Sequence, residues 1–485
     1  MKKRVLFFSR CDLVYLYGGL HQYLCDEFDI IHVVYSRLER DILFNKFGIK
    51  AFVTYKDQFL ENYIKDKEVD YHFLDELFIR NSNGRFNLSG AISVDRTFKH
   101  IDIKEAYKIT TIHYNTWNEV FKQSKPSFFI HEPTSLMINH MASMLCKEND
   151  CIYSTHIQYP GENEYDFLML DSDDGFATEL KWHYNQEDIN NLFCDSSRIQ
   201  NYLKSSREKL TVFFQENKKY QIGLSFLIRL FLKSILERYI SIRAFKLNKH
   251  SDLIDYYISH NLTFTQRLKN IITYRKFDYD EVDEGDLFYY YPLHIEPEAV
   301  VLYWADGVYK NQIKLIENIA SQLPPQVFLY VKDHPHFHGY REVIDYLRIK
   351  EINNVKLISP NIAGKELISK SIGVITLNGT SGFEALILNK HVITFAKPFY
   401  SLCPRVKYVQ NIKDLKKVLY DLRSVIYEDD VELYLFISAY LRSLKPGFPE
   451  MYYGLMKSTK IDKEKNLRDI SHGLSYFFKS YSLFK

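Results

Sequence analysis

Short apolar runs alternate with helix-compatible stretches over the first 183 residues. The strand candidates are residues 3–8, 28–35, 127–130 and 151–154, and residues 136–147 have the pattern of a helix between the last two. Strands that alternate with helices indicate a sheet covered by helices. We therefore expect residues 1–183 to form an N-terminal α/β lobe.

A second alternation begins near residue 286. Its strand candidates are residues 299–304, 326–332, 355–358, 373–377 and 391–395, with helices expected over 309–322 and 340–347. Strands joined by helical crossovers predict a second parallel sheet, over residues 286–410. Residues 184–285 are expected to form a mainly helical linker, and 411–485 a helical tail that packs back on the lobes. The fold class is thus α/β, with two Rossmann-like lobes.

Composition narrows the class of protein. The 485 residues are 46% hydrophobic and 26% charged, which is typical of a globular chain. The net charge of +2 argues against a protein that coats nucleic acid. None of the six cysteines forms a CxxC pair, and no apolar run reaches the length of a membrane span. We expect a cytoplasmic protein with reduced thiols and without an export signal.

Residues 224–242 have apolar positions at helical spacing and are flanked by basic residues. A basic amphipathic helix can lie on an anionic bilayer, which would place the protein at the inner face of the cytoplasmic membrane. The same pattern also fits a linker helix that packs its apolar face on the protein, and we favour that interpretation.

One candidate site follows the predicted strand 326–332 and contains Lys332, Asp333, His334 and Pro335. Pro335 restricts His334 to an extended conformation. The imidazole could bind a phosphate or ribose, or donate a proton to a leaving phosphate. Alternatively, this is a polar loop in which the imidazole caps the next turn.

A second candidate site is the stretch 376–386, which contains Asn378, Gly379, Thr380, Ser381 and Glu384. A strand that leads through glycines and hydroxyls into a helix presents backbone N–H groups to an anion. Glu384 could accept hydrogen bonds from ribose. The alternative is an ordinary helix start with Thr380 or Ser381 as N-cap. Only 18 residues are glycine, about half the usual frequency of roughly 7%, so we favour phosphate binding.

The N-terminal lobe offers two carboxylates. Glu132 follows the predicted strand 127–130, where it could act as general base, nucleophile or acid/base partner. Alternatively, it is a carboxylate at a helix entry. Asp173, in the acidic run 171–174, could supply the second carboxylate of a double displacement, although a solvated loop is the simpler interpretation. Gly18-Gly19 indicates only a turn, and residues 291–298 indicate a structured linker.

The order of these motifs resembles the bacterial capsular polysaccharide synthesis family, which includes retaining β-Kdo transferases. The motifs are Pro-Leu-His-x-Glu-Pro-Glu, Tyr-Val-Lys-Asp-His-Pro, Leu-Ile-x-Lys-Ser, Thr-Leu-Asn-Gly-Thr-Ser-Gly-Phe-Glu-Ala-Leu and His-Val-Ile-Thr-Phe-Ala-Lys-Pro-Phe-Tyr, within residues 291–400. The resemblance implies a GT-B type glycosyltransferase in which Lys332, His334, Pro335, Asn378–Ser381 and Glu384 hold CMP. Asp333 stands where the family pattern has Glu before His-Pro.

The resemblance implies transfer of a CMP-activated 2-keto sugar acid, Kdo above all, with retention, onto a surface glycan or its lipid-linked precursor. No cofactor or resident metal is expected, because the CMP-sugar is a substrate. Arg341, Lys397 and Arg405 are candidate partners for the sugar carboxylate. The alternatives are another donor, CMP-sialic acid or CDP-glycerol, and a non-catalytic scaffold of a synthesis or export complex.

Overall fold

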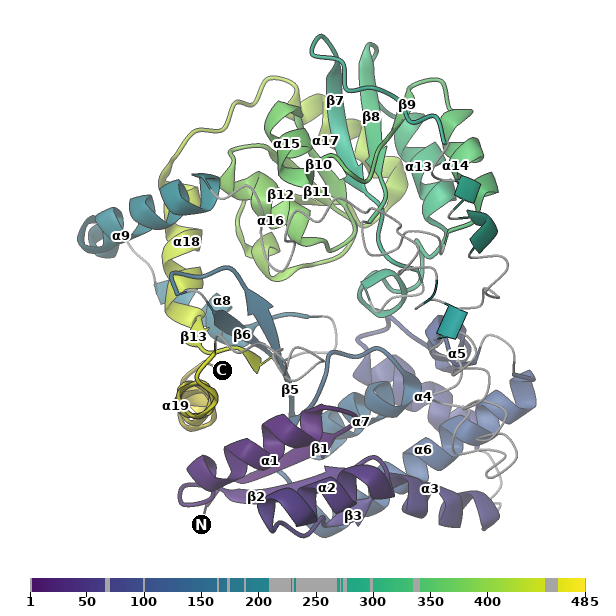
Figure 1. Cartoon of the computed structure of the whole chain (residues 1–485), viewed down its shortest axis with the longest axis vertical. Coiled ribbons are helices and arrows are strands. Elements are labelled where there is room, and N and C mark those ends of the chain that lie inside the picture. Colours follow the sequence, from purple (N-terminus) through teal and green to yellow (C-terminus); the bar gives the residue numbers. More distant parts are fainter. Residues whose placement is uncertain are drawn as a thin grey trace. The chain divides into compact units, whose positions relative to one another are not determined.

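The computed structural model contains two compact units (Figure 1). It describes residues 2–65, 70–98, 101–163, 165–171, 175–186, 189–208, 228, 231–232, 268–270, 272–273, 277–296, 300–334, 341–449 and 461–484. The first unit comprises residues 1–192 and 437–485, and the second comprises residues 193–436. Each unit has its own sheet, as expected for an α/β fold with two lobes.

The first unit is built on a seven-stranded sheet with the order β13-β6-β5-β4-β1-β2-β3. The strands are β1 (Arg4–Ser9), β2 (Asp29–Val34), β3 (Val53–Thr54), β4 (Phe128–Ile130), β5 (Ile152–Tyr159), β6 (Asp166–Leu170) and β13 (Lys445–Pro446). The strands from β3 to β5 pair in parallel, whereas β6 and β13 add an antiparallel edge. The parallel sheet expected from the apolar runs is confirmed.

Helices cover both faces of this sheet. They are α1 (Leu13–Leu24), α2 (Arg37–Phe47), α3 (Tyr55–Ile64), α4 (Tyr71–Asn81), α5 (Leu88–Val94), α6 (Ile103–Ser124), α7 (Met137–Glu148), α8 (Thr178–Gln186) and α19 (Lys463–Phe484), with α9 (Ile189–Glu208) and α18 (Val431–Ser443) at the unit boundaries. On one face, α1 and α19 pack against Val5 and Phe7 of β1. On the other, the ring of Trp117 packs against Phe8 and Phe129. Because side chains alternate along β1, its residues contribute to an apolar layer on each face of the sheet.

The pair Gly18-Gly19 lies inside α1, so the turn expected there is wrong. A Cβ atom at Gly18 would lie 2.5 Å from the Phe47 ring, and one at Gly19 would lie 2.9 Å from the Leu467 side chain. These glycines allow neighbouring side chains to approach α1 closely, and that packing requirement cannot be recognised from the local sequence.

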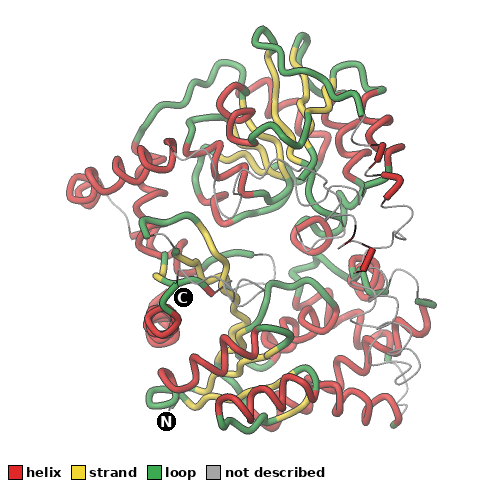
Figure 2. Tube along the Cα trace, viewed as in Figure 1, coloured by secondary structure: helices red, strands yellow, loops and turns green. Residues whose placement is uncertain are grey.

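The second unit is built on a six-stranded, entirely parallel sheet with the order β12-β11-β10-β7-β8-β9. Figure 2 draws strands in yellow and helices in red. The strands are β7 (Leu287–Pro292), β8 (Val327–Lys332), β9 (Val355–Ile358), β10 (Gly373–Thr376), β11 (His391–Thr394) and β12 (Val406–Tyr408). The helices are α13 (Gln312–Ala320), α14 (Val343–Lys350), α15 (Gly364–Lys370), α16 (Thr380–Ile387) and α17 (Leu415–Leu422), with short helical turns η1 (Val300–Trp304), η3 (Phe399–Leu402) and η4 (Ile412–Asp414). The second parallel sheet is confirmed.

The strand expected over residues 299–304 is wrong. Residues Val300–Trp304 form a π-helical turn, and the central strand is β7, which precedes it. A short apolar run does not distinguish a strand from a buried helical turn. Val301 and Tyr303 of this turn are buried in the second unit, so the apolar pattern reflects burial and not extended backbone. Of the stretch 291–298, the described residues 291–296 begin within the end of a strand and continue into the loop that follows it.

The two faces of the second sheet carry different side chains. Tyr289, Tyr291 and Val331 face a core that α13, α14 and α17 complete. The intervening residues of the same strands, including Tyr290 and Lys332, point to the opposite face. There α15 packs beside β7, and α16 packs beside β10 and β11. Polar strand-end residues thus come together on the α15–α16 face.

The residues 411–485, expected as a helical tail that packs back on the lobes, divide between the two units. Leu415, Leu419 and Leu422 of α17 belong to the core of the second unit, whereas Ile470, Leu474 and several aromatic residues of α19 belong to that of the first. Each helix carries an apolar stripe, and the stripe alone does not specify which sheet it covers.

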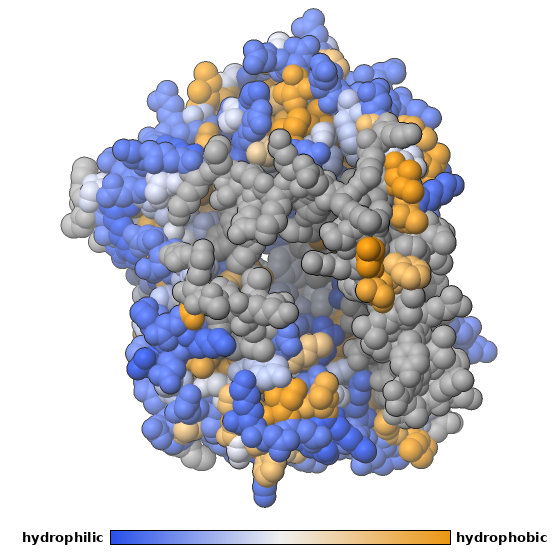
Figure 3. All heavy atoms as spheres, in the orientation of Figure 1, coloured by the Kyte–Doolittle hydropathy of each residue, from blue (hydrophilic) through white to orange (hydrophobic). Residues whose placement is uncertain are grey.

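Helices able to cross a membrane are not found among the described residues, because none there is both long and apolar enough. On the face drawn in Figure 3, the coloured surface is mostly hydrophilic, with apolar patches between the polar areas.

Apart from Ile228, Phe231 and Leu232, the segment 224–242 lies outside the described residues. Its two interpretations, packing helix and membrane-surface helix, therefore stay predictions.

Candidate functional site

The candidate site of the second unit lies where three adjacent strands end. In the order β10-β7-β8, the strands run parallel, so their carboxyl ends meet at one edge of the sheet. His294 follows β7, His334 follows β8, and Thr376 ends β10. Ligands of open α/β sheets bind at this edge. The topology therefore brings together the described residues of the two predicted motifs and residues 291–296.

His294 connects two of these strands. Its Nε2 lies 3.1 Å from Oγ1 of Thr376, its backbone N–H donates to Gln312 at 2.9 Å, and its carbonyl accepts from the Gln312 amide at 3.0 Å. Burial, with smaller effects of His334 and Arg341, lowers the pKa of His294 to about 3. His294 is therefore neutral at physiological pH, and its ring is held in place. Sequence reasoning treated this stretch as a linker, because β7 itself was not recognised.

His334 lies in the same network. Its backbone N–H donates to Oδ1 of Asp333 at 2.9 Å, and its side chain is half-buried. Since His334 is one of the groups that lower the pKa of His294, the two imidazoles lie within electrostatic reach of each other. Pro335, which was expected to restrict His334, lies outside the described residues.

Asp333 anchors the loop after β8. Its carboxylate accepts from the Tyr346 hydroxyl and lies 3.7 Å from Nε of Arg341. Arg341 also contacts Glu296 at 3.3 Å and donates to the His294 carbonyl at 3.2 Å. These contacts tie the loop after β7 to the loop after β8. The residue that departs from the family motif thus has a structural role here.

The helix α16 begins at the end of β10 without a side-chain cap. Gly379 is the N-cap residue, and its N–H donates to Oγ1 of Thr376 at 3.2 Å. The interpretation of Thr380 or Ser381 as N-cap is therefore wrong. Thr380 is exposed and Ser381 is half-buried, in the first turn of the helix. The N–H groups of a first helical turn have no partner within the helix, and they are well suited to bind an anion.

A chain of contacts joins the two predicted motifs. It runs from Asp333, the residue before His334, to Arg341, from Arg341 to the His294 carbonyl, from the His294 ring to Thr376, and from Thr376 to Gly379. The structure thus places the imidazole loop and the glycine-rich loop in one polar network. Asn378, which is half-buried, lies between Thr376 and Gly379 in the same loop.

Two ionisable residues lie behind this edge, Lys332, which is buried, and Glu384, which is half-buried. Burial lowers the pKa of Lys332 to about 8, although Asp333 and Glu384 oppose that shift. Burial raises the pKa of Glu384 to about 7, although Lys365 and Lys332 oppose it. Both groups therefore titrate near neutral pH, which is common at functional sites.

Two of the three candidate partners for a sugar carboxylate are engaged inside the protein. Arg341 contacts Asp333 and Glu296, as described above. Arg405 is 1% exposed by its side chain, lies 2.6 Å from Asp430 and donates to Asn389 at 2.8 Å. Lys397 is exposed, with its ammonium 5.1 Å from the Tyr408 ring centroid. Among the three, Lys397 best fits a ligand-binding role.

In the first unit, Glu132 lies beyond the carboxyl end of β4 and pairs with Arg10, which follows β1. The two charged groups are 2.7 Å apart. Burial acts to raise the pKa of Glu132, but Arg10 and His131 outweigh it and bring the pKa below its usual value. The helix α7 begins only at Met137. Glu132 is therefore an ionised, half-buried carboxylate outside the first turn of that helix, which argues against the helix-entry interpretation.

The imidazole of His131 lies beside this pair. Its Nδ1 is 2.9 Å from the Phe8 carbonyl, so Nδ1 carries the proton, and its Nε2 is 4.0 Å from the Glu132 carboxylate. Burial lowers the pKa of His131 to about 4. Asp173 lies outside the described residues, and its neighbour Asp171 accepts from the Tyr481 hydroxyl at 2.5 Å. The second carboxylate of a double displacement therefore stays a prediction.

Among the described residues, no group of three or more His, Cys, Asp or Glu side chains is arranged to hold a metal ion.

The family of this part of the chain follows from its sequence. Residues 187–421 match the family of capsule polysaccharide biosynthesis proteins. The matched segment contains every motif of the second unit described above, from His294 to Glu384. The resemblance to the capsular polysaccharide synthesis family is confirmed for this part of the chain.

A curated relative is Protein FixF of Sinorhizobium fredii (strain NBRC 101917 / NGR234). It is 34% identical over 124 residues, which are 25% of this chain and 29% of that protein. The chain therefore matches less than a third of the length of that relative.

Similar solved structures include the S. aureus MnaA-UDP co-structure, with 13% identity, a TM-score of 0.29 and coverage of 100% of this chain and 98% of that chain. Another is the beta Kdo 2,4 transferase of Thermosulfurimonas dismutans KpsC, with 14% identity, a TM-score of 0.32 and coverage of 67% and 83%. At these TM-scores the likeness carries no conclusion about activity, and the fold class rests on the two sheets themselves.

Proposed function

We propose that the protein is a glycosyltransferase of surface polysaccharide synthesis that transfers a CMP-activated 2-keto sugar acid, Kdo above all, to a bacterial glycan or its lipid-linked precursor. The observation that carries this proposal is the polar network at the ends of β7, β8 and β10, beside the uncapped first turn of α16. An anion such as the CMP phosphate fits a helix start of this kind. The family match of residues 187–421 supports the same class of reaction.

In this reaction, the bond between the anomeric carbon and the CMP phosphate oxygen breaks, and a bond to an acceptor hydroxyl oxygen forms. The hydroxyl loses its proton, and CMP leaves with an added negative charge. N–H groups at Thr380 and Ser381, together with the His334 imidazole, would stabilise that charge. Lys332 and Glu384 lie close enough to tune the charge of the same site.

The role of Glu132 follows from its ionisation. A general base works best with a pKa near the operating pH. The pKa of Glu132 lies below its usual value, so this carboxylate is a weak base that is fully ionised at neutral pH. These properties favour a nucleophile or a stabiliser of positive charge on the sugar, either of which suits a retaining reaction. Retention itself is taken from the family resemblance.

The donor class can be tested by thermal unfolding of the full chain with CMP, UMP, CMP-Kdo, CMP-sialic acid and CDP-glycerol. A ligand at one hundred times its Kd stabilises the folded state by about 2.7 kcal/mol. We expect CMP-Kdo and CMP to raise the Tm, and UMP to raise it less. Stronger stabilisation by CMP-sialic acid or CDP-glycerol would identify that compound, instead of CMP-Kdo, as the donor. Absence of stabilisation and turnover with every compound would refute the enzyme and favour a scaffold.

The role of His334 can be tested separately. We expect His334→Ala to lower turnover by about 100-fold or more, the usual contribution of acid–base catalysis, and to leave the Tm nearly unchanged. His472→Ala is a matched control, because His472 is exposed on α19 of the first unit. Turnover in His334→Ala equal to that of the wild type would remove His334 from the mechanism.

A further inference from the structure

A hollow of about 430 Å³ lies among three helices of the first unit. Tyr71, His72 and Asp75 come from α4, Leu88 and Ser89 from α5, and Tyr107 from α6. Small-ligand sites commonly have volumes of about 300–1,000 Å³. The size of this hollow therefore suits one or two sugar rings.

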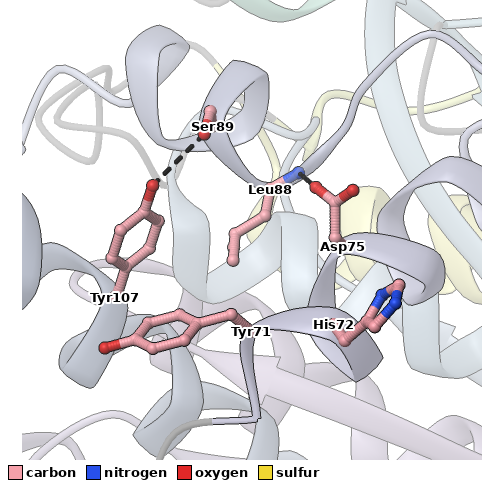
Figure 4. Close-up of a pocket in the computed structure, with 6 residues that line it drawn as sticks. All are labelled: Tyr71, His72, Asp75, Leu88, Ser89 and Tyr107. Carbon is pink, nitrogen blue, oxygen red and sulfur yellow. Dashed lines mark hydrogen bonds between the residues drawn. The ribbon is translucent and has the colours of Figure 1, made fainter.

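The walls of this hollow differ in chemistry. Figure 4 shows the rings of Tyr71 and Tyr107 on one side, and Asp75 and His72 on the other. The two tyrosine rings are 5.1 Å apart at 69°, so they form an aromatic corner. Tyr71 is 50% exposed, which leaves an apolar ring surface in water unless a ligand covers it.

Hydrogen bonds hold this arrangement. The Tyr107 hydroxyl lies 3.2 Å from the Ser89 hydroxyl, and the Leu88 N–H donates to Oδ1 of Asp75 at 2.8 Å (Figure 4). The Asp75 bond occupies one carboxylate oxygen and leaves lone pairs on Oδ2 for a ligand donor. The site thus offers a fixed aromatic corner opposite a fixed acceptor.

These properties select a class of ligand. A pyranose ring has a C–H face that packs on an aromatic ring and a rim of hydroxyls that donate to carboxylates. The described lining residues include Asp75 but no Lys or Arg, so a phosphate or an acidic sugar would meet an unfavourable charge. We infer that this hollow binds a neutral sugar residue of the acceptor glycan. The word acceptor rests on the proposed function, whereas the binding of a neutral sugar does not.

The inference can be tested with a glycan array of neutral and acidic bacterial oligosaccharides, probed with the labelled full chain. We expect retention on neutral oligosaccharides, and a loss of at least tenfold in Tyr71→Ala and in Tyr107→Ala. Tyr107→Phe keeps the ring, so it should retain most of the binding. Phe73→Ala is the matched control, because Phe73 lies on α4 but packs its ring against Tyr114, 5.1 Å away.

One further variant tests the effect of the negative charge of Asp75. Asp75→Asn keeps an oxygen that can accept from Leu88 and removes the negative charge, so we expect acidic oligosaccharides to be retained more strongly than by the wild type. Stabilisation by CMP should be equal in the wild type and in Tyr107→Ala, which separates this site from the donor site. Retention of acidic oligosaccharides only, retention of none, or unchanged retention in both tyrosine-to-alanine variants would overturn the inference.

Discussion

The substitution Gly382→Ala tests how the start of α16 is held. A Cβ atom at Gly382 would lie 2.4 Å from the hydroxyl oxygen of Tyr400 and 2.8 Å from the adjoining ring carbon. Tyr400 is 1% exposed, and its hydroxyl donates to the Gly379 carbonyl at 2.6 Å. The tyrosine has no room to retreat without breaking this bond, so alanine must disturb the loop that leads into the helix.

The magnitude follows from three effects. Overpacking a filled site costs about 1–3 kcal/mol, and losing the hydrogen bond from Tyr400 costs about 1 kcal/mol more. The higher helix propensity of alanine offsets about 1 kcal/mol. We therefore expect the free energy of unfolding to fall by about 2 kcal/mol, and the Tm of a unit of this size to fall by about 4–8 °C.

The assay is differential scanning calorimetry of the full chain, with CMP affinity measured in parallel. CMP affinity should fall as well, because the disturbed loop contains Gly379. Gly285→Ala is a matched control, since the atom nearest to a Cβ there is Oδ1 of Asp283 at 3.4 Å, which is an ordinary contact. We expect its Tm to stay at or slightly above that of the wild type.

A second variant tests whether the Tyr400 hydroxyl is the group that clashes with the new methyl group. Tyr400→Phe removes the oxygen that lies closest to the new methyl group and also removes the bond to Gly379. The double variant Gly382→Ala/Tyr400→Phe should therefore be less destabilised than the sum of the two single variants, by about 1 kcal/mol. Strict additivity, or a Tm of Gly382→Ala within 1 °C of the wild type by the same calorimetry, would refute the reasoning.

Two further predictions concern charge. The folded protein raises the pKa of Glu384 to about 7, so the folded state keeps a proton that the unfolded chain releases, and this contribution to stability falls as the pH rises toward 7. The free energy of unfolding of the wild type minus that of Glu384→Gln should decrease between about pH 5 and pH 7.5 in urea titrations; a constant difference would contradict the assignment. Arg10→Met should cost about 3 kcal/mol, the lower end of the range for a buried pair, because it leaves the half-buried Glu132 carboxylate without its partner. Arg10→Met/Glu132→Gln should recover part of that loss in the same titrations, and no recovery would show that the pair is not coupled.

Most strands of the second sheet could be predicted from the sequence. The limits of β8, β9, β10 and β11 agree with the expected apolar runs within a residue or two, because buried parallel strands are continuous apolar segments between turn residues. The strand β7 was missed. Its sequence Leu-Phe-Tyr-Tyr-Tyr-Pro is as apolar as the helical turn that follows. The local pattern therefore does not indicate which of the two segments forms the strand.

The candidate site was predictable only in part. His334 and the loop from Asn378 to Ser381 could be singled out, because histidine before proline and a glycine-rich strand-to-helix turn are unusual local chemistry. The contribution of His294 could not, because its importance comes from a hydrogen bond to Thr376, which lies 82 positions away in the sequence.

By itself, the sequence determined the fold class, most element positions and the two loops that carry polar groups, since these depend on local apolar periodicity and on turn chemistry. Tertiary structure decided the strand order β10-β7-β8, the position of His294 between the two loops and the assignment of α17 and α19 to different units. The physical reason is that burial, pKa shifts and long-range hydrogen bonds depend on which segments become neighbours, and apolar stripes of similar composition can pack on either sheet.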